Sequence, residues 1–473
     1  MASGHKAQPL KIGAKILSRH RTQAVSKMME KASFLLQEGY LDEAEKAYQD
    51  MLTICPEHCE SLTMLGAVYL QQGRLDEAEK TYKDILVLQP QYCNAFTMLA
   101  MVYRQRRNYE EAASTLEASL KINPNQQDAF YNLALILQSM ERDEEALLSF
   151  DHAIALNPSY ADAYWNKALL KLRLGHYEEG WELYEWRWKT ELKEFAPSFL
   201  QPLWLGQESL AGKTIFLHAE QGLGDTIQFC RYVSMVEALG AKVILAIPES
   251  LSKLTSTLKG SFQIITDRKL AIEFDYHCPL MSLPLAFKTT LETIPAGTYL
   301  YADSIKKIQW KERLGVKTKP RIGVVWSGSR EFKYDRKRSI PFDTFSTLLS
   351  SELAEFFDFH SLQREICTEY KHSLSRVSVK THMTDLHDFS ETAALISELD
   401  LVISVDTAVV HLAGALGKPV WVLLPYDPDF RWLTEREDSP WYPTARLFRQ
   451  TQAGEWEGVI EAVSIALKAK KFS

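Results

Sequence analysis

The segment GRLDEAEKTYKDILVLQP, residues 73–90, is one unit of a repeat that fills the amino-terminal part of the chain. The same pattern starts 34 residues earlier, as GYLDEAEKAY in residues 39–48. This period predicts pairs of amphipathic helices that stack into an α-solenoid, because one pair cannot bury its apolar face alone. Prolines, alanines and large residues recur at the same step: Pro56, Pro90, Pro124 and Pro158; Ala44, Ala78, Ala112 and Ala146; Tyr48, Tyr82, Leu116, Phe150 and Tyr184.

The repeat resembles the tetratricopeptide repeat, and we expect a superhelix of five helix pairs over residues 24–190. The last pair departs from the pattern with Trp181, Trp186 and Trp188, which predicts docking onto the next domain. A plain terminal cap is the alternative. Such an array offers a concave surface, so we expect it to hold a partner protein. Small residues stand where paired helices must approach closely: Gly66, Ala100, Ala134 and Ala168.

The second half of the chain has the pattern of an α/β enzyme body. Strand-like and helical runs alternate after residue 195, which predicts parallel sheets built from βαβ units. A polar, lysine-rich stretch at residues 301–320 divides the set into two Rossmann-like lobes, 195–305 and 306–473. We expect each lobe to present the carboxyl ends of its strands to a cleft. The expected strands lie in KTIFLHA, AKVILAI, FQIITD, RIGVVWSG, EFFDFHSL, LDLVISV, KPVWVLLP and WYPTARLFRQ.

Composition narrows the class of protein. The 473 residues carry a net charge of −7, which does not suggest a nucleic-acid partner. Six cysteines are scattered without a C-x-x-C pair or a zinc spacing, as in a reducing compartment. No apolar run reaches the roughly 18 residues of a membrane helix, and the amino terminus lacks the apolar stretch of a secretory signal. We therefore predict a cytoplasmic protein without a transmembrane segment.

A turn in the first lobe carries the first candidate for chemistry. In HAEQGLGDTIQFCRY, residues 218–232, a strand-like run meets Gly222 and Gly224, and Asp225 opens a helix. A carboxylate there can act as the general base that removes a proton from an attacking hydroxyl. The alternative is a helix cap, which stabilises a helix by about 1 kcal/mol. Glu220 and His218 are reserve candidates, although a histidine inside an apolar strand favours a packing role.

The second lobe carries a candidate site for phosphate. In SVDTAVVHLAGALGKPVWVLLP, residues 404–425, Asp406 and Thr407 lie at a strand-to-helix turn, and His411 follows one helical turn later. Free N–H groups at a helix start can bind an anion. The alternative is a helix cap with an internally satisfied histidine. The loop WSGSREFKYDRKRSIPF adds Ser327 and the phosphate candidates Arg336 and Arg338, for which a solvated charge run is the alternative. Gln363, after the strand-like run FFDFHSL, is a candidate to read the base or ribose of a nucleotide.

These motifs together with RSIPF resemble the bacterial GT-B glycosyltransferases related to heptosyltransferases, in particular the group that carries tetratricopeptide repeats. The resemblance implies inverting sugar transfer from a nucleotide-sugar donor held between the lobes, without a metal or other cofactor. It implies Asp225 as base, and we expect Gly222, Gly224 and the second-lobe candidates to bind the donor. It also implies a closing helix that crosses back to the first lobe. The D-P-D sequence at Asp427–Asp429 includes a proline and lacks the context of a metal motif.

Some repeat-bearing members of this group modify flagellin. We therefore expect an enzyme that glycosylates Ser or Thr of an acceptor protein held by the repeats, with flagellin favoured. One alternative is a heptosyltransferase-like enzyme with a glycan or lipid acceptor. A second is a non-catalytic adaptor that carries a degenerate transferase body.

Overall fold

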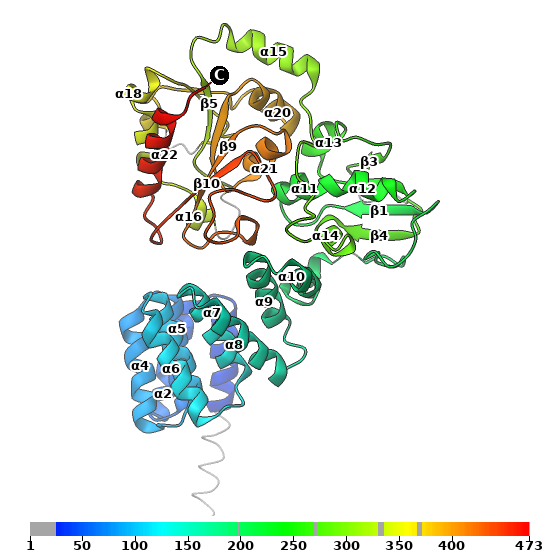
Figure 1. The fold of residues 1–473 in the computed structure, drawn as a ribbon. Helices are drawn as coiled ribbons and strands as arrows, with labels where there is room; N and C mark the ends of the chain where they lie inside the picture. The colour runs from blue at the N-terminus through cyan, green and yellow to red at the C-terminus, as the bar shows by residue number, and fades with distance from the viewer. Residues whose placement is uncertain (1–24, 197, 268–271, 330–334, 367–370, 473) are drawn as a thin grey trace, which may run out of the picture. The chain divides into compact units, whose positions relative to one another are not determined.

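The computed structural model describes residues 25–196, 198–267, 272–329, 335–366 and 371–472 (Figure 1). The chain forms two compact units, one ending at Tyr164 and the other running from Trp165 to Ser473.

The first unit is an α-solenoid of antiparallel helix pairs, as predicted. Each pair packs on the next, and the repeating alanines and large residues are buried between them. Gly66 shows why this position stays small, because an added Cβ would lie 2.6 Å from Cζ of Tyr82. After a helix over residues 25–37, the helices are α2 (Leu41–Ile54), α3 (Cys59–Gln71), α4 (Leu75–Leu88), α5 (Cys93–Gln105), α6 (Tyr109–Ile122), α7 (Gln127–Ser139) and α8 (Asp143–Leu156).

The fifth helix pair belongs to the second unit from Trp165 onward. It comprises α9 (Ala161–Arg173) and α10 (Tyr177–Tyr184), which continues into the 3-10 turns η1 (Glu185–Lys189) and η2 (Glu191–Phe195). Trp181 is fully buried, and its ring meets Phe229 of the first lobe and Phe430 of the second at 5.8–6.1 Å between centroids. The aromatic residues that break the repeat pattern therefore include a core residue of the α/β body.

The first α/β lobe contains a parallel sheet of four strands in the order β3-β2-β1-β4. The strand that enters the Gly222 turn, β1, is central and buried, which explains its continuous apolar run. The elements of this lobe are β1 (Thr214–His218), α11 (Leu223–Phe229), η3 (Cys230–Tyr232), α12 (Val233–Ala238), β2 (Lys242–Ala246), α13 (Glu249–Thr255), β3 (Gln263–Ile265), β4 (Tyr276–Pro279), η4 (Leu280–Ser282) and α14 (Leu283–Ala286).

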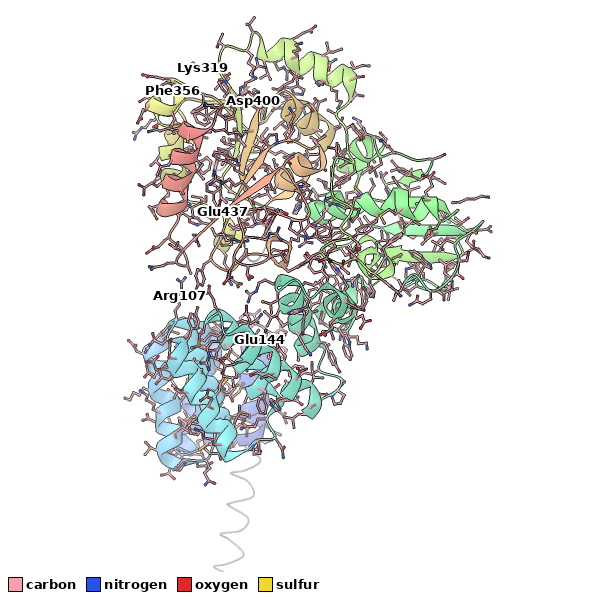
Figure 2. All side chains as sticks on the ribbon, viewed as in Figure 1. Arg107, Glu144, Lys319, Phe356, Asp400 and Glu437 are labelled. Atoms are coloured by element: carbon pink, nitrogen blue, oxygen red, sulfur yellow. The ribbon has the colours of Figure 1, made fainter. Side chains whose placement is uncertain are left out.

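The second lobe contains a parallel sheet of six strands in the order β10-β9-β8-β5-β6-β7. Counted from β5, this is the Rossmann order 3-2-1-4-5-6. Asp400, labelled in Figure 2, accepts a hydrogen bond of 2.8 Å from the backbone N–H of Arg321 and so ties β8 to β5 at their amino ends. The strands are β5 (Arg321–Val325), β6 (Asp358–Ser361), β7 (Val379–Thr381), β8 (Leu401–Val405), β9 (Val420–Leu424) and β10 (Ala445–Arg449).

Helices cover both faces of the second sheet (Figure 1). The last of them, α22, packs on β10, α17 and η5 of its own lobe, where Val459, Val463 and Leu467 are buried. The expectation that this closing helix crosses to the first lobe is therefore wrong. The helices are α15 (Ser304–Leu314), α16 (Asp335–Arg338), α17 (Phe342–Ser346), η5 (Thr347–Leu349), α18 (Ser351–Ala354), α19 (Lys371–Leu374), α20 (Phe389–Ser397), α21 (Ala408–Ala415), η7 (Phe430–Trp432) and α22 (Glu457–Ala469).

Candidate active site

Each sheet has one point where the order of its strands reverses: β1 beside β4 in the first lobe, and β5 beside β8 in the second. Ligands of open parallel sheets bind outside the carboxyl ends of the strands at such points. The segment 219–225 follows β1, and Asp406 follows β8. The sequence candidates therefore lie where this topology favours a ligand.

Asp225 lies in the first turn of α11, and its carboxylate accepts hydrogen bonds from two other residues. The backbone N–H of Gly222 donates to its Oδ2 at 2.7 Å, so the carboxylate does cap the helix. The guanidinium of Arg431, from the second lobe, donates to its Oδ1. Burial raises the pKa of Asp225, and the charge of Arg431 opposes that shift. The side chain thus combines a cap, an ion pair between lobes and a raised basicity.

Arg431 is a site residue that the sequence interpretation missed. It is almost fully buried in η7, and it donates through Nε to Oε1 of Gln228 at 2.6 Å and through Nη1 to Oδ1 of Asp429 at 2.8 Å. Burial alone would lower its pKa, but the charges of Asp429 and Asp225 outweigh burial and raise it. The sequence feature that could have pointed to Arg431 is its position two residues after the D-P-D sequence.

Asp406 and His411 lie at the start of α21. Nε2 of His411 is 3.8 Å from Oδ1 of Asp406, and Nδ1 is 2.9 Å from the hydroxyl of Tyr442. Burial, reinforced by the charge of Asp429, raises the pKa of Asp406 to about 6. Burial, reinforced by Arg431, lowers the pKa of His411 well below its usual value. A neutral imidazole thus lies near a carboxyl that titrates close to neutral pH.

Gly224 allows the first turns of α11 and α21 to pack against each other. An added Cβ on Gly224 would lie 2.8 Å from Cδ2 of His411 and 3.5 Å from Cα of Ala408. The first turns of α11 and α21 therefore touch at Gly224, which brings the elements that carry Asp225 and Asp406 together. Gly222 contributes its N–H to the cap on Asp225.

The remaining donor-site candidates shape the loops at the second reversal point. Arg338 donates through Nη1 to the carbonyl of Asp406 at 2.9 Å and through Nε to Oδ1 of Asp335 at 3.0 Å. Oε1 of Gln363 accepts from the backbone N–H groups of Trp326 and Ser327 at 3.1 and 3.0 Å. The side chain of Thr407, the N-cap of α21, makes no capping bond. The side chain of Arg336 lies outside the described residues.

The two carboxylates of the D-P-D sequence have separate roles. Asp427 pairs with Arg173 at 2.8 Å, whereas Asp429 pairs with Arg431. Within the part of the chain that the structure describes, no group of three or more His, Cys, Asp and Glu side chains is arranged to hold a metal ion.

Comparisons with known families agree with the two architectures. The model of the family described as glycosyltransferase family 9 (heptosyltransferase) matches residues 360–449. Two repeat models match the first half: the middle TPR-like domain of cilia and flagella-associated protein 70 at residues 14–123, and a tetratricopeptide repeat at residues 97–151. The chain thus matches models of tetratricopeptide repeats in its first half and, over residues 360–449, the model of the family 9 glycosyltransferases.

Among curated relatives, Protein FlbA of Caulobacter vibrioides is 32% identical over 327 residues, which are 63% of this chain and 53% of that protein. The chain thus spans about half the length of this relative. A thermophilic repeat protein of Thermus thermophilus is 20% identical, with a TM-score of 0.33 over 36% of this chain and 93% of that one. MamA of Desulfovibrio magneticus RS-1 is 20% identical, with a TM-score of 0.31 over 37% of this chain and 97% of that one.

The matched part of the family 9 domain includes Asp406, His411 and Arg431, while Asp225 and Arg338 lie outside it. The matched segment therefore contains one side of the candidate site, Arg338 precedes it in the same lobe, and Asp225 comes from the first lobe. In the ranges that the structure describes, no helix is long and apolar enough to cross a membrane.

Proposed function

We propose that this chain is an inverting, metal-independent protein glycosyltransferase of GT-B architecture. The nucleotide-sugar donor binds at the β5/β8 reversal point, and Asp225 is the general base. One observation carries the proposal: the start of α11, with Asp225, lies against the start of α21, with Asp406, at Gly224. A base and a helix start suited to a diphosphate are thus side by side.

The reaction uses these groups in a definite way. The acceptor hydroxyl oxygen attacks the anomeric carbon as the bond from that carbon to the diphosphate breaks, and Asp225 takes the hydroxyl proton. Attack opposite the leaving group inverts the anomeric configuration. The N–H groups at the start of α21 and the guanidinium of Arg338 stabilise the charge that develops on the diphosphate.

The engaged state of Asp225 favours the rival reading of a non-catalytic adaptor, because each carboxylate oxygen already has a partner. A carboxylate oxygen, however, accepts two hydrogen bonds, so each retains capacity for a substrate proton. Burial also raises the pKa of Asp225 against the opposing charge of Arg431, and a carboxylate with a raised pKa is a stronger base.

The acceptor is proposed from the repeats. A solenoid of stacked helix pairs is suited to holding a protein, so we propose Ser or Thr of a cytoplasmic acceptor protein, with flagellin as the first candidate. The choice of flagellin rests on the resemblance to repeat-bearing members of the group.

The test begins with thermal unfolding in the presence of UDP, GDP, ADP and CMP and their sugar conjugates, because specific binding stabilises the folded state. The best donor is then incubated with purified flagellin, and the product is analysed by intact-protein mass spectrometry. A mass increase of one sugar residue, absent in Asp225→Asn, supports the proposal. Nucleotide binding without any transfer to protein or glycan acceptors would instead support the adaptor.

A further inference from the structure

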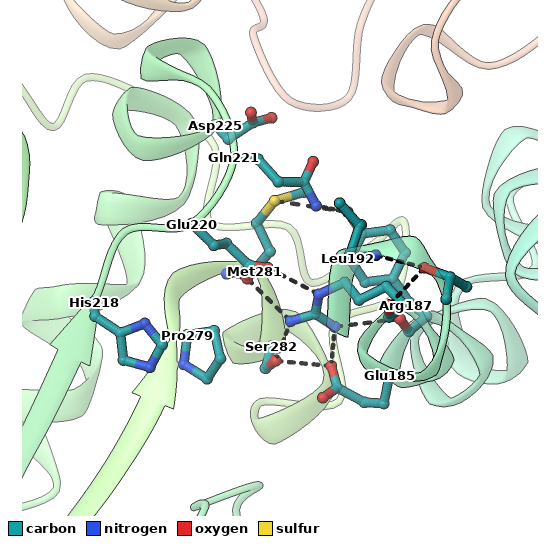
Figure 3. A network of polar contacts seen from close by, with 12 residues as sticks. Glu185, Arg187, Leu192, His218, Glu220, Gln221, Asp225, Pro279, Met281 and Ser282 are labelled. Atoms are coloured by element: carbon teal, nitrogen blue, oxygen red, sulfur yellow. Dashed lines mark hydrogen bonds and ion pairs between the residues drawn. The ribbon is translucent and has the colours of Figure 1, made fainter. Parts of the chain in front are cut away.

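A buried ion-pair network joins the last helix pair to the first lobe (Figure 3). Arg187, in η1, has no exposed surface and forms a two-pronged pair with Glu220, through Nε at 2.9 Å and Nη2 at 3.0 Å. Its Nη1 donates to Oε1 of Glu185 at 2.7 Å, and its Nη2 also donates to Oγ of Ser282 at 2.7 Å. All three nitrogens of the guanidinium are therefore engaged.

The network occupies the β1/β4 reversal point of the first lobe. Glu220 follows β1 by two residues, and Ser282 ends η4, which follows β4 directly. Oε1 of Glu220 also accepts from the backbone N–H of Met281 at 3.2 Å, which ties the two loops together. A side chain from the last repeat pair thus fills the place where the topology would favour a ligand.

The network lies immediately before Asp225 in the chain. Gln221 has a φ of 39°, in the left-handed region that a residue with a side chain seldom adopts. Its amide donates to the hydroxyl of the buried Tyr184 at 3.2 Å, also in the last repeat pair. Such a backbone state persists only where its surroundings hold it. Contacts from η1 and α10 therefore hold two successive residues, Glu220 and Gln221, ahead of Gly222, whose N–H orients the Asp225 carboxylate.

We infer that Arg187 is a positioning residue, which fixes the loop between β1 and α11 and so holds the Asp225 carboxylate in place for catalysis. The inference rests on the proposed function of Asp225. It makes the last repeat pair a working part of the transferase, because Arg187 acts on the base through Glu220 without touching a substrate. Because Glu220 is paired with Arg187, the loop between β1 and α11 cannot move away from η1 without leaving the Glu220 carboxylate unpaired.

The test uses the full chain with three variants. Arg187→Lys keeps the charge but cannot form the two-pronged pair. Arg187→Met combined with Glu220→Gln removes the charges together, so that no buried carboxylate of this pair is left without its cation. Lys189→Ala, an exposed cation on the same 3-10 turn, is the matched control. Hydrogen exchange is followed in peptides covering residues 219–229 and, as an internal reference, 401–415.

We expect exchange in residues 219–229 to accelerate at least 10-fold in both Arg187 variants, with residues 401–415 and the control unchanged. Turnover should fall 10-fold or more without a change in donor affinity. The acid limb of the kcat profile should move to lower pH, because a loosened loop hydrates Asp225, whose pKa burial raises. Unchanged exchange in 219–229, or equal acceleration in both peptides with normal turnover per folded molecule, would overturn the positioning role.

Asp225→Asn separates this inference from the proposed function. Normal turnover in that variant would overturn the catalytic assignment of Asp225 and the positioning role with it. Low turnover in Asp225→Asn, together with normal turnover and unchanged exchange in Arg187→Lys, would overturn the positioning role alone.

Discussion

Replacing Asp225 by asparagine separates its three roles. The amide oxygen of asparagine can still accept the N–H of Gly222, so the helix cap should survive. Arg431 keeps Asp429 and Gln228 as partners, so its charge stays compensated. We therefore expect the free energy of unfolding to fall by only about 1.5–3 kcal/mol, the range for one lost charge-assisted hydrogen bond. The proposed general-base role is removed entirely, because an amide cannot take the proton of the acceptor hydroxyl.

We expect turnover in Asp225→Asn to fall about 100-fold or more, which is the contribution of a positioned general base. Nucleotide affinity should stay within about 2-fold, because the donor loops of the second lobe are untouched. The assay combines a thermal melt, a nucleotide titration and initial rates of sugar transfer. A variant that melts normally, binds nucleotide and retains most of its turnover would show that Asp225 only caps α11 and pairs with Arg431.

Four further outcomes are expected. Arg338→Ala should weaken nucleotide binding about 10- to 100-fold in a titration, since a charge-assisted bond contributes about 1.5–3 kcal/mol; unchanged affinity contradicts the donor role. Gly224→Ala should lower stability by about 1–3 kcal/mol in denaturant melts, because the new Cβ meets the His411 ring at 2.8 Å; wild-type stability would show that the helix starts can separate. Turnover should survive a chelator, and recovery only on adding magnesium or manganese would restore a metal role. Burial lowers the pKa of His360 to about 4. The folded state therefore binds fewer protons than the unfolded chain below pH 6.5, and about 3 kcal/mol of stability is lost as pH falls toward 4; a His360→Gln variant should show a shallower decline between pH 7 and 4.5, and parallel melting curves would refute this.

Most of the fold was predictable because its signals are periodic. A 34-residue step specifies helix pairs, and continuous apolar runs bounded by turns specify buried parallel strands. The strands β4 and β7 were not predicted, since they are short and lack such runs: β4 is YHCP and β7 is VKT. The placement of α22 was wrong because an amphipathic pattern shows that a helix has a partner without showing which one.

The candidate site was predictable only where its residues follow a strand directly. Asp406 directly follows β8, and Asp225 stands in the first turn of the helix after β1; both lie beyond the carboxyl ends of parallel strands, where such sheets place their ligands, so their positions in the sequence carry information. Gln363 also follows a strand, but its side chain holds the backbone of Trp326 and Ser327, a role that depends on the neighbouring strand. Arg431 and Arg187 lie in 3-10 turns far along the chain from Asp225 and Glu220, and sequence spacing gives no sign of these long-range pairs.

The two buried arginines constrain Asp225 from opposite directions. Arg431 reaches it from the second lobe and contacts the carboxylate directly, whereas Arg187 comes from the last repeat pair and acts five residues upstream, at Glu220. Removing either guanidinium leaves a buried carboxylate without its cation, so the loss of either contact strongly destabilises the folded state. Trp181 packs against Phe229 at the end of α11 and against Phe430 beside Arg431, which links both arginines through one aromatic core. The contacts that hold the Asp225 carboxylate and the loop before it therefore come from three segments: the last repeat pair, the loop after β1 and η7. A motif scan that treats the repeats and the α/β body as separate modules therefore separates Arg187 from Glu220 and from the loop that leads to Asp225.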